Sequence, residues 1–164
     1  MSHDLLDPRV KDALEHYGLK AETIGCDPEL ADTAAFCEHY GYSPGQSANT
    51  IIIATRTEEP IYVACLVLAT TKLDVNKKVR QLIGVRKLSF ATADQTKELT
   101  GMLIGGVTVV GLPDIPLYID SRVMEQEHVI IGGGNRSSKL ILKPEELLKL
   151  PRVEIIEQLA LVRE

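Results

Sequence analysis

The sequence predicts an α+β fold built around a mixed β-sheet. Segments with helix caps and helical spacing alternate along the chain with short apolar runs rich in β-branched residues. Two of these runs, residues 50–55 and 61–69, are joined by a short polar turn, whereas others are separated by a predicted helix. A chain that combines a hairpin with helical connections is typical of the α+β class.

Capping residues mark the predicted helices. Asp7 suits the N-cap position, Pro8 suits the first helical position, and Gly18 ends a first helix. An acidic or hydroxyl cap, an opening proline or a closing glycine predicts five more helices in the same way. These are expected at residues 32–40, 43–46, 74–83, 94–100 and 144–150. Asp94 is the expected N-cap of its helix, and residues 43–46 have the pattern of a capping box.

The predicted strands are short apolar runs between these helices. Residues 50–55 and 61–69 are apolar almost throughout, which is typical of strands buried on both faces. The polar turn at residues 56–60 should join them as an antiparallel hairpin. Further strands are expected at residues 21–26, 88–90, 107–110, 117–119, 128–131 and 139–142.

Composition places the chain among globular proteins. Its 164 residues are enough for a single domain over residues 1–164, with 45% apolar and 25% charged residues. No apolar run approaches the roughly 18 residues of a membrane span, and the start does not resemble a secretory signal. Three cysteines without a C-x-x-C pair argue against disulfides and a zinc ribbon, so we expect reduced thiols and a cytoplasmic location.

The net charge of −5 argues against binding along a nucleic acid duplex, where affinity comes largely from neutralised phosphates. Residues 72–87, here called the basic segment, differ from the rest of the chain. Their six cations, set against the single acid Asp74, are Lys72, Lys77, Lys78, Arg80, Arg86 and Lys87. The basic segment could contact the end of an RNA, or it could be an ordinary solvated helix face.

Common enzyme signatures are absent from the sequence. It has no nucleophile elbow, no phosphate-binding P-loop, no H-E-x-x-H and no dinucleotide fingerprint. Cys37 and His39 would point about 200° apart on a helix, so they cannot share a metal or form a nucleophile–base pair. Cys65 lies in an apolar run without a nearby histidine, which gives a thiol hydrolase little support. We therefore expect neither a metal nor a cofactor.

Two glycine-rich segments are candidates for a binding site. Adjacent glycines at 105 and 106 allow close approach of a ligand or another backbone, and their N–H groups could face a carbonyl or an oxyanion. The alternative is a tight bend without a ligand. Three glycines at 132–134, followed by Arg136 and Lys139, could form an anion-binding nest, or equally a hairpin turn with a basic surface.

Four blocks, in this order and spacing, resemble the YbaK / prolyl-tRNA-synthetase-associated domain family of aminoacyl-tRNA deacylases. The blocks are residues 64–74, 100–111, 116–120 and 129–136. The resemblance covers roughly residues 20–150. It implies a mixed sheet that curls toward a barrel and is covered by helices.

The resemblance also implies an activity, which is hydrolysis of the ester that joins an amino acid to a mischarged tRNA. Family members act in trans without a protein nucleophile. Positioned water attacks, the ribose hydroxyl of the substrate assists, and backbone donors hold the carbonyl. The implied partner is the 3′ end of aminoacyl-tRNA, and an aminoacyl-tRNA synthetase could be a second one.

Site residues follow from the same resemblance. The catalytic positions are Asn49, Gly105 and Gly106. The substrate-binding positions are Thr50, Thr108, Val109, Gly132, Gly133, Gly134 and Arg136. The family has lysine in place of Asn49 and proline in place of Val109. Because asparagine keeps a donor and an acceptor but no charge, the alternative is a non-catalytic module that binds an aminoacyl ligand or docks a synthetase.

Overall fold

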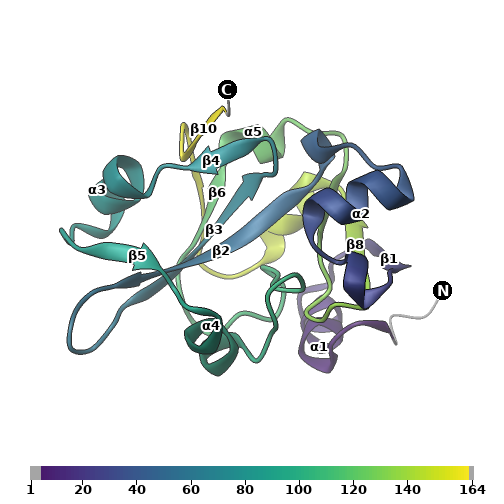
Figure 1. The fold of residues 1–164 in the computed structure, drawn as a ribbon, viewed down its shortest axis with the longest axis horizontal. Coiled ribbons are helices and arrows are strands. Elements are labelled where there is room, and N and C mark those ends of the chain that lie inside the picture. Colours follow the sequence, from purple (N-terminus) through teal and green to yellow (C-terminus); the bar gives the residue numbers. More distant parts are fainter. Residues whose placement is uncertain (1–4, 163–164) are drawn as a thin grey trace.

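The computed structural model describes residues 5–162 and confirms a mixed α+β fold (Figure 1). Its strands form three open sheets, so the barrel-like closure implied by the resemblance is not confirmed. The five-stranded sheet has the order β5 (Leu88–Phe90), β2 (Ala48–Thr55), β3 (Tyr62–Leu68), β6 (Leu117–Asp120) and β9 (Val153–Ile156). The smaller sheets are β1 (Ala21–Gly25), β8 (Ser138–Leu142) and β7 (Val129–Gly132), and β10 (Ala160–Val162) with β4 (Thr71–Leu73).

The predicted hairpin is the centre of the five-stranded sheet. β2 and β3 pair antiparallel, with Ile51 opposite Cys65, and both strands are largely buried. β6 then pairs parallel with β3, and β9 pairs parallel with β6. A parallel pair needs a crossover connection, which the long stretch between β3 and β6 provides. The sheet is therefore mixed, as the sequence predicts.

Local capping signals place two of the main helices correctly. In α1 (Pro8–Tyr17) the Asp7 side chain accepts a hydrogen bond from the N–H of Arg9, and Gly18 ends the helix with a φ of 67°. α2 (Thr33–Tyr40) ends at Gly41, whose φ is 78°. Glycine adopts these left-handed conformations without the steric penalty of a side chain.

Three predicted helices differ in detail. In α4 (Ala93–Thr100) the N-cap is Thr92 rather than Asp94, because Thr92 and Gln95 form a reciprocal capping box. Residues 74–83 do not form one α-helix but a π-helical turn, η4 (Val75–Val79), followed by α3 (Arg80–Ile83). The helix expected at residues 144–150 is a 3₁₀ helix, η5 (Pro144–Lys149).

The prediction of a strand at residues 107–110 is wrong. These residues run through turns, with Gly111 at a φ of 89°, and Val109 and Val110 are buried by packing rather than by pairing. Several short elements were not expected from the sequence: η2 (Pro28–Leu30), β4, α5 (Ser121–Met124), β9 and β10. The capping-box pattern at residues 43–46 forms the 3₁₀ turn η3 (Pro44–Gln46), in which Ser43 accepts from the N–H of Gly45.

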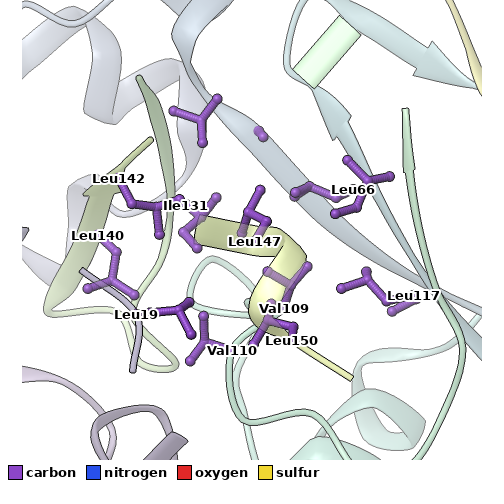
Figure 2. Packing of buried hydrophobic residues seen from close by; sticks show 14 of the residues in the cluster. Leu19, Leu66, Val109, Val110, Leu117, Ile131, Leu140, Leu142, Leu147 and Leu150 are labelled. Carbon is purple, nitrogen blue, oxygen red and sulfur yellow. The ribbon is translucent and has the colours of Figure 1, made fainter. Parts of the chain in front are cut away.

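The largest hydrophobic cluster links the two larger sheets. Leu66 and Leu117 of the five-stranded sheet belong to the same cluster as Ile131 and Leu140 of the three-stranded sheet. Figure 2 shows Leu147 of η5 between these two groups. This packing holds the start of β2 near β7, where the candidate site lies.

Candidate functional site

A pocket lies at the junction of the two larger sheets. Ser47 forms an isolated parallel bridge with Ile130, so the beginning of β2 runs beside β7. The pocket has a volume of about 220 Å³, and residues of α2 and of the loop around Gly105 line its other sides. Sites for drug-sized ligands usually enclose roughly 300–1,000 Å³. This pocket therefore suits a small chemical group.

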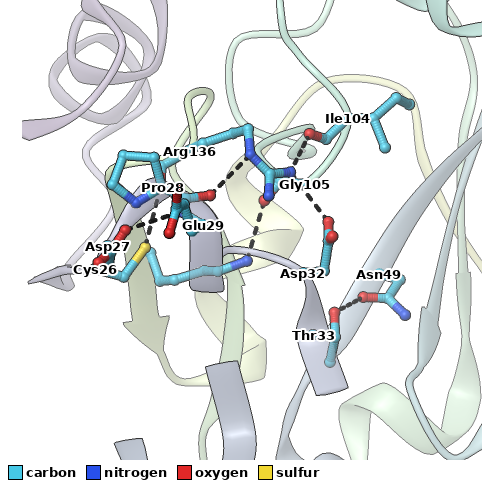
Figure 3. A network of polar contacts seen from close by, with 11 residues as sticks. Cys26, Asp27, Pro28, Glu29, Asp32, Thr33, Asn49, Ile104, Gly105 and Arg136 are labelled. Atoms are coloured by element: carbon cyan, nitrogen blue, oxygen red, sulfur yellow. Dashed lines mark hydrogen bonds and ion pairs between the residues drawn. The ribbon is translucent and has the colours of Figure 1, made fainter. Parts of the chain in front are cut away.

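Asn49 and Thr50 of β2 form one polar wall. The side-chain carbonyl of Asn49 accepts a 2.6 Å hydrogen bond from the hydroxyl of Thr33, the first residue of α2. This bond orients the amide of Asn49 and leaves its NH₂ group facing away from Thr33 (Figure 3). The hydroxyl oxygen of Thr50 is buried and has no hydrogen-bond partner among residues 5–162. The NH₂ group of Asn49 is therefore left for a ligand, and Thr50 adds a hydroxyl that no other described residue uses.

Arg136 stabilises the opposite wall of the pocket. Its Nη1 donates to the carbonyl oxygen of Ile104 at 2.8 Å and to Oδ1 of Asp32 at 3.0 Å, while its Nε donates to the carbonyl oxygen of Pro28 at 3.0 Å. Arg136 itself does not line the pocket. It ties the loop around Gly105 to the segment before α2, as Figure 3 shows.

Lys139 of β8 extends its side chain into the pocket. The residue is 6% exposed, and its Nζ donates a 3.1 Å hydrogen bond to the carbonyl oxygen of Gly105 and lies 5.4 Å from the ring centre of Phe36. Burial lowers the pKa of Lys139, and the nearby Cys26 and Asp32 partly oppose that effect. The sequence suggested Lys139 merely as a cation beside the glycine turn. A lysine inside an otherwise apolar strand is the signal that could have placed it here.

The glycines divide into two groups. Gly105 and Gly132 line the pocket, whereas Gly106, Gly133 and Gly134 do not. The N–H of Gly106 is already used, because it donates to the carbonyl oxygen of Leu103 at 2.9 Å. It is thus not a free donor for an oxyanion.

Close backbone approach explains these glycines. The carbonyl oxygen of Gly106 accepts a 2.7 Å bond from the N–H of Gly134, and that of Gly133 accepts a 3.1 Å bond from the N–H of Asp7. The triple glycine is therefore the turn between β7 and β8, packed against the loop and against the start of α1. A Cβ at Gly106 would lie 2.2 Å from the carbonyl oxygen of Asn135.

Two other sequence-suggested positions lie away from the pocket. Thr108 and Val109 are 0% and 2% exposed, and neither is among the pocket-lining residues. Val109 packs in the core, as Figure 2 shows. Among the suggested residues, the structure thus brings together Asn49, Thr50, Gly105 and Gly132.

The pocket contains no histidine and no cysteine among its lining residues, and its one acidic lining residue is Asp32. Residues 5–162 hold no group of three or more histidine, cysteine, aspartate or glutamate side chains that could bind a metal ion. Cys65 is fully buried, and burial raises its pKa to about 12, so its thiol is neutral at pH 7. The arrangement can position and polarise a small group, and its lining includes no histidine that could act as a base beside a hydroxyl or a thiol.

No helix in the part of the chain that the structure describes has the length and apolar character needed to cross a bilayer.

The basic segment lies far from this pocket. Lys77, Arg80 and Arg86 line a separate, more open cavity of about 400 Å³. Figure 1 shows α3 and α2 toward opposite ends of the long axis of the molecule. The basic segment could therefore contact a long ligand that reaches across the molecule, but not the contents of the pocket.

Comparisons with known proteins give the chain a family. A family model described as "aminoacyl-tRNA editing domain" matches residues 27–150, a range that includes every pocket-lining residue. The crystal structure of a hypothetical protein is 24% identical in sequence and has a TM-score of 0.80. This match covers 91% of the chain and 97% of that protein. It shows a shared fold.

A second crystal structure is described as that of "a putative trans-editing enzyme for prolyl tRNA synthetase". Its sequence identity is 27% and its TM-score is 0.78. The match covers 97% of this chain and 99% of that protein, so the two have the same extent.

Proposed function

The chain belongs to the aminoacyl-tRNA editing domain family and has the role of an aminoacyl-tRNA deacylase, and we propose that the pocket between the two larger sheets is where it acts. One observation carries this assignment. The pocket is small, has no histidine or cysteine in its lining, and all of its lining residues fall within the region that matches the family. Such a site suits a reaction catalysed by positioning and electrostatics.

The proposed reaction is hydrolysis of the aminoacyl ester at the 3′ end of tRNA. The oxygen of a water molecule bonds to the carbonyl carbon, the bond from that carbon to the ribose oxygen breaks, and the ribose oxygen receives a proton. The products are the free amino acid and the uncharged tRNA. The ribose hydroxyl next to the ester assists the water, as the family resemblance implies.

The pocket residues have distinct roles in this proposal. Asn49, oriented by Thr33, holds the ester, while Thr50 and Gly132 contact the aminoacyl group. The carboxylate of Asp32 is available to the α-ammonium of the substrate. The loop at Gly105 forms the wall opposite β2.

The other suggested residues act indirectly in this proposal. The loop around Gly105 packs closely against the β7–β8 turn because Gly106, Gly133 and Gly134 have no side chains. Arg136 holds the same loop in place through its hydrogen bond to the carbonyl oxygen of Ile104. Thr108 and Val109 support the loop from the core.

Action in trans, beside a synthetase, is a further part of the proposal. It is supported by the match, over nearly the whole of both chains, to the protein described as "a putative trans-editing enzyme for prolyl tRNA synthetase". A cytoplasmic location, expected from the unpaired cysteines, stays a prediction.

The decisive experiment incubates the purified chain with a panel of mischarged tRNAs and measures release of free amino acid. We expect tRNAs that carry small amino acids to be hydrolysed fastest, because the cavity, at about 220 Å³, is small. A single methylene gives a discrimination of only about 1–3 kcal/mol, so neighbouring amino acids should differ by roughly 10–200-fold. No release from any tRNA would contradict the proposal.

A non-catalytic aminoacyl-binding module is the second candidate. Asn49 favours it, because an uncharged amide already bonded to Thr33 can recognise an ester without activating it. The same panel separates the two candidates, since a binding module would retain the charged tRNA and release no amino acid.

Replacing Asn49 with lysine should raise or redirect deacylation without unfolding the protein. Asn49 is half-buried at a pocket wall, so a longer side chain can reach the pocket, and lysine is the residue implied at this position by the family resemblance. The rates of Asn49→Lys and of the original protein should be compared across the same panel. An unchanged pattern of rates would show that residue 49 does not set specificity.

A further inference from the structure

Lys139 is a buried cation without a buried counter-charge. The residue is 6% exposed. Among residues 5–162, no carboxylate forms an ion pair with its Nζ within 4.0 Å. An ammonium has three N–H donors. The structure gives one of them a partner, the carbonyl oxygen of Gly105.

Such an arrangement is costly for the folded protein. Removing an ammonium from water without an ionic partner carries a large free-energy penalty, and an apolar residue of similar size often gives equal or better stability. The contact with the ring of Phe36 offsets part of this penalty. Stability alone therefore does not account for a lysine at this position, and its place in the pocket points to a ligand.

The chemistry of the substrate indicates which of its atoms the ammonium of Lys139 contacts. An aminoacyl ester carries a positive α-ammonium, which Lys139 repels and Asp32 attracts. The negative charge that develops during hydrolysis is on the carbonyl oxygen, as the carbonyl becomes tetrahedral. A fixed cation that is itself largely buried stabilises that charge far more than an exposed cation in bulk water would.

We propose that Lys139 is a catalytic residue whose ammonium donates a hydrogen bond to the carbonyl oxygen of the ester and stabilises the oxyanion formed when water attacks. Gly105 positions this ammonium through its carbonyl oxygen, and Asn49 holds the ester from the opposite side. The inference rests on the proposed deacylase function. It names a group that stabilises the oxyanion of that reaction electrostatically.

The test compares the kinetics of Lys139→Met and Lys139→Arg with those of the original protein on several mischarged tRNAs. Methionine keeps the length of the side chain and removes the charge. Loss of one oxyanion donor typically lowers kcat by about 10²–10³-fold. We expect a fall of this size in Lys139→Met for every aminoacyl group, with KM changed little. Lys143→Met, which removes an exposed lysine next to the same strand, is the matched control and should keep the original rate.

The pH dependence gives a second measurement. Burial lowers the pKa of Lys139, with Arg136 adding to this effect and Cys26, Asp32 and Cys37 opposing it. The stabilising charge is therefore lost as the pH rises through that lowered value. The enzymatic rate, divided by the rate without protein, should therefore fall at alkaline pH. Arginine stays charged over this range, so Lys139→Arg should recover part of kcat and show no such fall.

The outcomes are distinguishable. If the original protein releases no amino acid, the proposed function is wrong and the role of Lys139 is wrong with it. If the original protein is active and a folded Lys139→Met keeps its kcat, or slows on one aminoacyl group alone, the inference about Lys139 is wrong while the function stands. An arginine variant as slow as the methionine variant would also overturn it. Thermal unfolding of each variant checks that the fold is kept.

Discussion

Gly106→Ala is expected to destabilise the protein and to abolish most of its deacylase activity. A Cβ at this position would lie 2.2 Å from the carbonyl oxygen and 2.4 Å from the carbonyl carbon of Asn135. Both are backbone atoms, so no flexible side chain can move aside. Overpacking of this kind usually costs about 1–3 kcal/mol and occasionally more.

The loss of activity follows from the hydrogen bonds of Gly106. Its N–H bonds to Leu103, and its carbonyl oxygen bonds to the N–H of Gly134. A shift of residue 106 therefore moves both the loop that carries Gly105 and the β7–β8 turn. The pocket wall formed by Gly105 and Gly132 should lose its geometry.

Denaturant unfolding and the rate of amino acid release together check this prediction. Gly45→Ala is the matched control, because its Cβ would meet Ser43 Oγ at 3.5 Å, an ordinary contact. It should change the free energy of unfolding by less than about 1 kcal/mol. Equal stability of the two alanine variants would show that the close approach at Gly106 can relax at little cost.

Arg136→Leu should weaken substrate binding more than it weakens the fold. The guanidinium joins Ile104, Pro28 and Asp32 through three hydrogen bonds, so its loss frees the loop beside the pocket. The ion pair is partly open to solvent, with side chains 28% and 67% exposed. The free energy of unfolding should therefore fall by about 1–2 kcal/mol. The loss of three fully buried hydrogen bonds to a charged group would lower it further.

The kinetic effect of Arg136→Leu should appear mainly in KM. Reordering a loosened loop on binding at a cost of about 1.4 kcal/mol raises KM roughly tenfold. Steady-state rates measured over a range of mischarged tRNA concentrations separate KM from kcat. Arg56→Leu removes the same charge from an exposed turn and should leave both constants unchanged. An unaltered KM in Arg136→Leu would mean that the loop keeps its position without Arg136.

Local interactions explain why much of the fold could be predicted. The cap of α1 at Asp7 and its end at Gly18 depend on atoms within a few residues, as does the end of α2 at Gly41. The β2–β3 hairpin depends on two apolar runs and the short turn between them. Errors at this level arose where two local signals competed. Thr92 with Gln95 makes a complete capping box, so it prevails over Asp94.

The segment at residues 107–110 shows the limit of local reasoning. Its apolar, β-branched residues are suited to a strand, yet they pack into the core as part of a loop. Burial satisfies their hydrophobicity in either form, and periodicity in so short a run cannot distinguish the two. Long-range packing against η5 and the sheets therefore decides the outcome.

By itself the sequence determined the α+β class, the central hairpin, most helix ends and, through its ordered blocks, the likeness to an editing domain. The tertiary structure alone decided which of those residues meet in one pocket. Asn49 and Gly105 line the same pocket, Val109 is in the core, and Arg136 lies behind the wall. It also placed Lys139 beside Gly105, which is distant in sequence. The physical reason is that such contacts depend on how two sheets pack together, and no pattern of neighbouring residues specifies that arrangement.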